Sequence, residues 1–192
     1  MSLIPAFKIG VWNAWIFMSV SLLQMLAIYL VDKRAWERSH TPSEAKRNKL
    51  ERYTGIIGNF IWLSALIYSV FLPLQLGTMW FYIGLSVFIV GVTFAAIATF
   101  NFITAPPDQL ITRGAYSFSR HPLYLATFFI LIGSGIATVS WLFILFSVIM
   151  AFCVFQEALV EERYCLTRYD NAYQEYMKRT PRWIGIPKKY AK

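Results

Sequence analysis

The sequence predicts an all-α integral membrane protein with five transmembrane helices, of which the last two form a helical hairpin, and a cytoplasmic C-terminal helix. The composition gives the first reason: 57% of the 192 residues are hydrophobic, 18% are aromatic and only 15% are charged. A water-soluble domain of this size needs far fewer apolar residues. The lengths of the apolar blocks give the second reason, and the placement of the basic residues on one side of the membrane gives the third. We expect the whole chain, 1–192, to form a single membrane domain.

The apolar blocks set the number of spans. A helix needs about 20 apolar residues to cross about 30 Å of hydrocarbon, and the blocks 9–31, 54–72 and 79–101 meet this requirement. Two further segments, 123–138 and 139–160, are separated only by GSGIATVS, whose glycines and small polar residues suit a tight turn. These two segments predict the hairpin and bring the number of spans to five.

The basic residues predict the orientation. Of the 18 Lys and Arg residues, only Lys8 precedes the first span, while seven lie in 32–53, two in 102–122 and eight after residue 160. With five spans, 17 of the 18 fall on one side of the membrane. The positive-inside rule then places the amino terminus outside and the carboxyl tail in the cytoplasm. A membrane surface accounts for the net charge of +8, so no nucleic-acid partner is expected.

The segment 101–124 connects the third and fourth spans, and we call it the connector. It is the first candidate for a functional site. Loops of this length are usually functional or disordered, and the aromatic and aliphatic residues of this one argue against disorder. A histidine before a proline at a helix start is also a common cap or interface anchor. The polar and tyrosine side chains of the segment are Asn101, Asp108, Gln109, Arg113, Tyr116, Arg120, His121 and Tyr124.

The carboxyl tail carries the second candidate set. Glu157, Glu161 and Glu162 follow the last span, where an acid close to hydrocarbon is costly unless it is paired or functional. A salt bridge at the interface would also explain them. The stretch DNAYQEYMKRTPRW predicts an amphipathic surface helix that Pro181 ends. Such a helix either lies on the lipid headgroups or closes a pocket.

No metal site is expected. The two histidines, His40 and His121, lie in different loops and have no cysteine at ligand spacing.

Several pieces of the sequence together resemble a known family. GAYSFSRHPLY, an apolar hairpin, a double glutamate and YxxYMKRTPRW follow one another over about residues 101–185. This order is similar to that of membrane methyltransferases typified by isoprenylcysteine carboxyl methyltransferase, a group also similar to the phospholipid N-methyltransferases. The resemblance implies an S-adenosylmethionine site at the cytoplasmic ends of the last two spans, covered by the connector and the tail. The cofactor-binding residues that it implies by position are Asn101, Asp108, Gln109, Leu110, Ile111, Tyr116, Arg120, His121, Pro122, Leu123, Tyr124 and Glu161.

The chemistry of these residues is compatible with that cofactor. Arg120 or His121 suits its carboxylate and Glu161 its ammonium, while Asp108 or Glu161 suits its ribose hydroxyls. Aromatic walls suit adenine and the sulfonium, and the connector supplies tyrosines for them. Methyl transfer needs alignment of the reactants and exclusion of water, so no nucleophilic residue is expected.

The acceptor is expected to be lipophilic, with its tail reaching the site sideways from the membrane lipid. By resemblance, the first choice is the carboxylate of a prenylated cysteine. The family places an arginine for that carboxylate where this sequence has Glu157. Glu157 would repel a carboxylate unless it is protonated or paired with Arg163, so these two residues are the candidates for orienting the acceptor. A lipid amine or thiol remains an alternative.

Two other classes of protein fit part of the sequence. A small membrane carrier would be basic and multi-spanning too, but its spans should carry charged or Pro/Gly-broken positions near mid-membrane. Here the charges lie at the ends of the spans. A membrane scaffold without activity would not predict the ordered set in 101–185.

Overall fold

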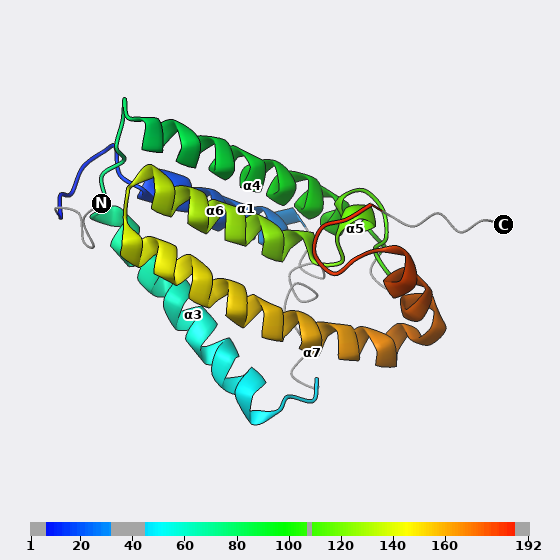
Figure 1. The fold of residues 1–192 in the computed structure, drawn as a ribbon. Helices are drawn as coiled ribbons and strands as arrows, with labels where there is room; N and C mark the ends of the chain where they lie inside the picture. Colours follow the sequence, from blue (N-terminus) through cyan, green and yellow to red (C-terminus); the bar gives the residue numbers. More distant parts are fainter. Residues whose placement is uncertain (1–6, 32–44, 107–108, 187–192) are drawn as a thin grey trace.

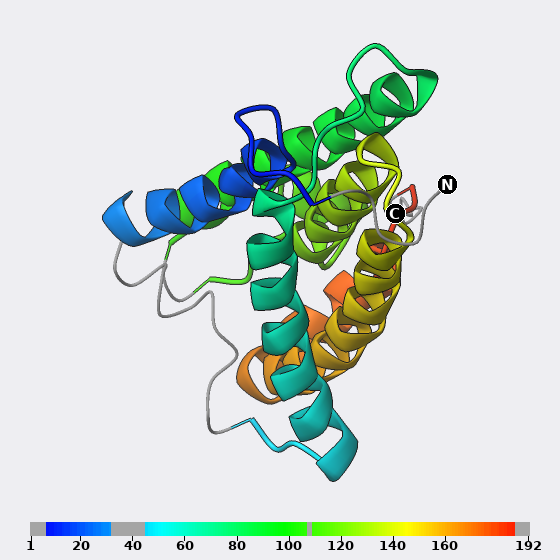
Figure 2. The same cartoon turned by 90° about the vertical axis from the view of Figure 1, so that its left-hand side faces the viewer.

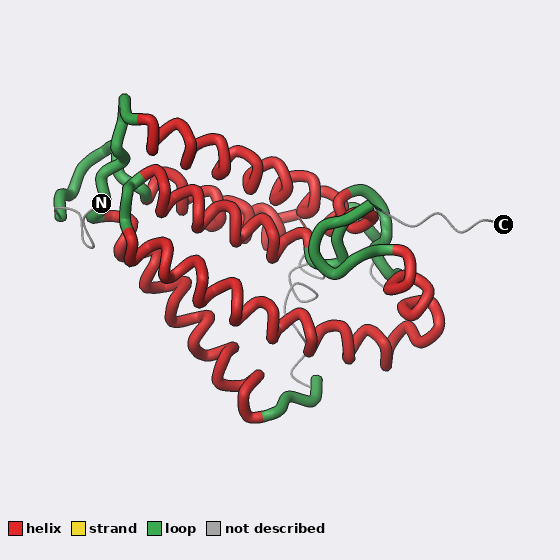
Figure 3. Tube along the Cα trace, viewed as in Figure 1, coloured by secondary structure: helices red, strands yellow, loops and turns green. Residues whose placement is uncertain are grey.

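The computed structural model describes residues 7–31, 45–106 and 109–186, and in these ranges the chain is all-helical. Figure 3 shows helices and loops but no strand, and the only extended pairing in the described part is an isolated bridge between Asn13 and Pro73. The all-α prediction is therefore confirmed for this part of the chain. The helices are α1 (Trp15–Val31), α3 (Lys49–Val70), α4 (Met79–Ile103), α5 (Ala115–Phe118), α6 (Pro122–Ala137) and α7 (Trp141–Arg179).

Three of these helices, α3, α4 and α7, are long and apolar enough to cross a membrane. The helices α1 and α6 are also apolar but have only 17 and 16 residues. The chain therefore has the helices of a membrane protein. The five-span count and the orientation stay predictions.

Helix α3 begins five residues before the predicted block, and a capping box explains why. The Asn48 side chain accepts a hydrogen bond from the Glu51 N–H, and the Glu51 side chain accepts one from the Asn48 N–H, both at 2.8 Å. This reciprocal pair satisfies two backbone donors that a helix start leaves open. The first turn of α3 thus projects polar residues beyond its apolar part.

Helices α4 and α6 form the tightest pair, because glycines let their backbones approach. A Cβ added at Gly84 would collide with the Ala137 nitrogen, and one at Gly133 would lie 2.7 Å from the Phe88 nitrogen. Small residues at such contacts are typical of helix packing in membranes. The prediction that the glycines of GSGIATVS form a turn is wrong: α6 continues through them, and residues 138–140 make the connection.

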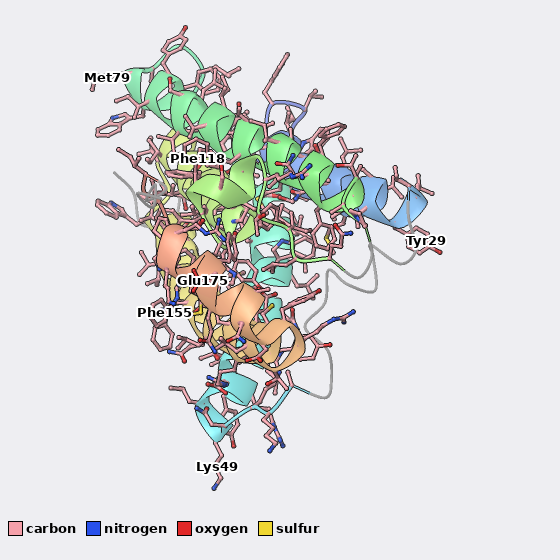
Figure 4. All side chains as sticks on the ribbon, turned by 90° about the vertical axis from the view of Figure 1, so that its right-hand side faces the viewer. Tyr29, Lys49, Met79, Phe118, Phe155 and Glu175 are labelled. Carbon is pink, nitrogen blue, oxygen red and sulfur yellow. The ribbon has the colours of Figure 1, made fainter. Side chains whose placement is uncertain are left out.

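Helix α7 combines the last predicted span and the predicted tail helix. It runs on past residue 160 and bends at Asp170, whose φ of 42° is not helical, before it ends at Arg179. We call the part after the bend, 171–179, the tail helix. Figure 1 shows it turning back toward α5, and Figure 4 views this end directly, with Glu175 on the tail helix and Phe118 on α5.

The helices form two groups. Figures 1 and 2 show α1, α4 and α6 together, with α7 beside α6 and α3 beside α7. Phe17 of α1 stacks on Phe88 of α4 with ring centroids 4.0 Å apart, inside the buried core. The connector, the start of α6 and the tail helix all gather at one end of this bundle.

Candidate active site

A cavity of about 220 Å³ lies at the end of the bundle where the connector and the tail helix meet. The connector, the start of α6 and the second half of α7 form its walls. Phe102 at the end of α4 contributes one side chain. The other lining residues are Gln109, Leu110, Ile111, Tyr116, Arg120, His121, Pro122, Leu123, Tyr124, Glu161, Tyr164, Cys165, Arg168, Tyr169, Tyr173 and Tyr176.

His121 lies between two carboxylates of α7. Its Nδ1 is 3.2 Å from Glu161 and its Nε2 is 3.3 Å from Glu162, and its side chain is only 5% exposed. The histidine occupies the N-cap position of α6, where its side chain makes no capping hydrogen bond. The Tyr124 hydroxyl, one turn along α6, donates to Glu161 at 2.7 Å. His121 therefore holds the cap position of α6, as the cap alternative expects, but its side chain pairs with the carboxylates of α7.

The two adjacent glutamates face different groups. Glu161 is 29% exposed and lines the cavity. Glu162 is 5% exposed and accepts hydrogen bonds from both ends of the Arg182 guanidinium, at 2.9 and 2.7 Å, while the Arg120 guanidinium lies 2.9 Å away. Successive helix residues point about 100° apart, which separates the two roles. Glu161 can contact a ligand, and Glu162 ties α6 to the chain after α7.

These pairs shift the charge equilibria of the groups beyond the apolar part of α7. Burial alone raises the pKa of Glu162, but hydrogen bonds from His121 and Arg182 and the charge of Arg120 outweigh it and lower this pKa to about 2. Burial alone lowers the pKa of His121, but its hydrogen bonds to Glu161 and Glu162 and their charges outweigh it and raise this pKa above its ordinary value. The site therefore favours a charged imidazolium between two carboxylates.

The raised pKa of His121 predicts a pH dependence of stability. A group that binds its proton more tightly in the folded state contributes its full stability below its unfolded pKa of about 6.5 and loses it as pH rises through the folded value. Thermal unfolding in detergent should therefore show the wild type losing more stability from pH 6 upward than His121→Gln, which lacks the titrating group. Parallel pH profiles for the two proteins would contradict the paired imidazolium.

Residues 180–186, which we call the C-terminal strap, cover the start of α6. The Arg120 N–H donates to the Pro181 carbonyl at 3.1 Å, and the Gly185 N–H donates to the Phe118 carbonyl at 3.3 Å. Peptide groups alone thus hold the strap at two points against the junction of α5 and α6.

Side chains add to this attachment. The Ser119 hydroxyl donates to the Arg182 carbonyl at 3.1 Å. Trp183 packs with its ring centroid 6.0 Å from that of His121 and 6.1 Å from that of Phe155. The Tyr176 hydroxyl of the tail helix donates to the carbonyl of Tyr116 at 2.6 Å. The tail helix therefore forms part of the cavity wall through Tyr173 and Tyr176, while the strap packs on His121 without lining the cavity.

Asn101 supports the connector from outside the cavity lining. Its side-chain oxygen accepts a hydrogen bond from the Ala115 N–H at 2.9 Å. Gly114, with φ of 61°, allows this contact, because a Cβ at that position would collide with the Asn101 amide. Asn101 thus fixes the turn that leads into α5.

The structure brings together ten of the predicted cofactor-binding residues in the lining of one cavity. Asn101 lies behind the connector, and Asp108 lies outside the described residues. The ten are Gln109, Leu110, Ile111, Tyr116, Arg120, His121, Pro122, Leu123, Tyr124 and Glu161.

The two residues predicted to orient the acceptor lie outside this lining and face α3. Glu157 forms a two-point ion pair with Arg47, at 2.7 and 2.6 Å. Arg163 lies 2.7 Å from Glu51 of the α3 capping box. The pairing of Glu157 with Arg163 that the sequence suggested does not form, because these side chains reach different residues at the start of α3.

The comparison with protein families decides the affiliation of the chain. Residues 72–172, just over half of the sequence, match the profile described as phospholipid methyltransferase. The chain belongs to the phospholipid methyltransferase family. Isoprenylcysteine carboxyl methyltransferases share this family, so the resemblance seen in the sequence is confirmed. A comparison with curated proteins found no match.

Membership of the phospholipid methyltransferase family gives the cavity a ligand to be tested against, because these enzymes generally use S-adenosylmethionine. The Arg120 Nε is buried and has no hydrogen-bond partner among the described residues, and Arg120 is one of the residues that line the cavity. A buried donor of this kind needs an acceptor, and the carboxylate of the cofactor is one. Glu161 is an acceptor for its ammonium. The residues present therefore fit the cofactor.

The sequence alone did not predict part of the cavity wall, nor the two arginines that pair with glutamates of α7. Tyr164, Cys165, Arg168 and Tyr169 follow Glu161 at helical spacings of three, four, seven and eight residues, and this periodicity was available in the sequence. No comparable signal pairs Arg182 with Glu162 or Arg47 with Glu157, because those contacts depend on the fold. Within the described ranges, no group of three or more metal-ligating side chains occurs.

Proposed function

We propose that the protein transfers a methyl group from S-adenosylmethionine to a lipophilic acceptor at the membrane. The observation that carries this proposal is the buried Nε of Arg120, a donor that lacks an acceptor among the described residues, on a residue that lines the same cavity as Glu161. The cofactor's amino-acid end has the complementary pair of charges, a carboxylate and an ammonium. Membership of a methyltransferase family supports the same conclusion.

The residues of the cavity would bind the cofactor, orient the acceptor and exclude water. The cofactor supplies an activated methyl group when it is bound, so the protein has to align an acceptor with it and keep water away. Tyr116 and Tyr124 offer aromatic faces for the adenine and the sulfonium. Tyr173 and Tyr176 of the tail helix are buried and line the cavity, where they would help to keep water away from the reactants.

The first candidate acceptor is the carboxylate of a prenylated cysteine. A carboxylate is ionised at neutral pH, so it needs no base to act as a nucleophile. The expected obstacle was repulsion by Glu157, but Arg47 forms two hydrogen bonds with this side chain and balances its charge. The apolar helices next to the cavity suit a lipid tail that approaches from the membrane.

A lipid amine is the second candidate, and the family description favours it because it names phospholipid methyltransferases. An ammonium headgroup must lose a proton before its nitrogen attacks the methyl group. Glu161 lines the cavity and carries a carboxylate that could accept this proton. A lipid thiol would need the same step.

A methyl-transfer panel tests the proposal. Purified protein is incubated with S-adenosylmethionine carrying a radiolabelled methyl group and with a farnesylated cysteine analogue, an aminophospholipid or a small water-soluble thiol. Label on the farnesylated analogue supports the first candidate, and label on the phospholipid supports the second. Label on the small thiol alone would contradict a lipophilic acceptor.

Isothermal titration with the cofactor and its demethylated product separates an enzyme from a carrier or scaffold. The methyltransferase predicts saturable heat at about one ligand per chain. A folded protein that gives no heat with either ligand would support a scaffold or carrier instead.

A further inference from the structure

Helix α3 lies at the edge of the bundle, and among the described residues one side of it makes the main contacts with other helices. It packs mainly on α7. At Gly58, for example, an added Cβ would lie 3.2 Å from the Cβ of Cys153. Figure 2 shows α3 beside α7. Thr54, Ile61 and Ala65 are buried on this side, so the contact face repeats every three or four residues.

The opposite side of α3 presents a regular exposed stripe. Its members are separated by three, four, four and three residues, which is the spacing of a seam between two packed helices. Four of the five are large apolar residues, and one is an amide. The stripe consists of Ile56, Asn59, Leu63, Ile67 and Val70.

Asn59 is the unusual member of this stripe. It lies five residues inside the predicted span 54–72, about 7.5 Å along the helix at 1.5 Å per residue, and its side chain is exposed and makes no hydrogen bond to any described residue. The exposed hydroxyls of Ser86 and Thr93 on α4 differ, because they donate to carbonyls of their own helix. An amide that faces hydrocarbon without a partner is costly.

We propose that α3 packs against α3 of a second copy of this chain, with the two Asn59 side chains hydrogen-bonded to each other across the interface. A carboxamide carries both donors and an acceptor, so the same residue on a two-fold related helix satisfies it. A single asparagine in an otherwise apolar seam also fixes the register of two helices. This inference does not depend on methyl transfer.

The stripe supports a second copy over a lipid as its occupant. Acyl chains have no hydrogen-bonding groups, so lipid would cover the apolar residues but leave the Asn59 amide unsatisfied. Ile56 and Leu63, about one turn to either side of Asn59, supply close packing around the paired amides. In membranes such packing and interhelical hydrogen bonds, more than water exclusion, hold helices together.

Cysteine cross-linking in native membranes tests this interface. Asn59→Cys should form a disulfide-linked dimer on mild oxidation, because the two positions face each other. Ile57→Cys is the matched control: its native side chain is 44% exposed, but it points about 160° away from Asn59 around the helix. The native Cys153 and Cys165 are not exposed, and the unmodified protein gives the background.

A second variant keeps the test independent of oxidation. Asn59→Leu retains the apolar surface, and its dimer should dissociate about tenfold more readily in detergent, measured by light scattering against concentration. Equal cross-linking at positions 59 and 57, or a folded Asn59→Cys protein that stays monomeric or links to a protein of another mass, would overturn the proposal. So would unchanged dimer dissociation in Asn59→Leu.

Discussion

Replacing Glu162 with glutamine is expected to lower the free energy of unfolding by about 3–5 kcal/mol, because it breaks a buried ion pair from one side. Two guanidinium groups and an imidazolium would lose the carboxylate that balances them. Equilibrium unfolding in detergent, followed by circular dichroism, measures the change. Of the predicted changes in stability, this one is the largest.

The matched control is Glu175→Gln on the tail helix. Glu175 pairs with Lys178 at 2.6 Å, but both side chains are about half exposed, and exposed pairs contribute little. This variant should unfold like the wild type. Similar unfolding curves for the wild type and both variants would show that Glu162 does not connect α6 to the strap.

Replacing Glu161 with glutamine, or His121 with alanine, is expected to weaken cofactor binding by about 10–100-fold, because a hydrogen bond to a charged group contributes about 1.5–3 kcal/mol. Both residues line the cavity. Glu157→Gln should bind the cofactor like the wild type, since Glu157 faces Arg47 outside the lining. Isothermal titration of the four proteins measures the difference.

The pattern of losses separates two failures. If the wild type binds the cofactor and all three variants bind equally well, the assigned site is wrong while the methyltransferase proposal stands. If Glu157→Gln loses the most affinity, the cofactor lies nearer to α3 than we propose. His121→Ala also removes a partner of Glu162, so its unfolding curve has to be measured beside its affinity.

Much of the helical framework follows from local sequence signals. The predicted block 79–101 and helix α4, Met79–Ile103, nearly coincide, because an uninterrupted apolar run has one way to satisfy its backbone in a membrane. The start of α3 was placed late, although Asn48 and Glu51 carry a capping-box signal that apolarity alone ignores. Local patterns thus predict the existence of an element better than its ends.

The error at GSGIATVS has a different cause. Glycine suits both a turn and a close helix contact, and the choice depends on a partner that the local sequence does not contain. Gly133 lies against the backbone of α4 near Phe88, so the helix continues through it. Only the packing of α4 against α6 decides between the two interpretations.

The candidate site was predictable in its membership but not in its pairings. The motifs identified the residues around His121 and Glu161, because the order and spacing of motifs can be recognised in the sequence alone. Which of the adjacent glutamates faces the cavity depends on the rotation of α7, and that is fixed by contacts such as Arg182 with Glu162. Contacts between residues that are far apart in the chain leave no comparable motif in the sequence.

The two backbone hydrogen bonds of the C-terminal strap have a consequence for sequence change. Peptide groups at Pro181 and Gly185 make them, and every residue type supplies a carbonyl while every type except proline supplies an N–H. Drift of the strap side chains other than Arg182, which pairs with Glu162, would therefore leave these two hydrogen bonds in place. Relatives with dissimilar carboxyl tails could keep the same strap over the start of α6, so divergence there would be poor grounds for inferring a lost activity.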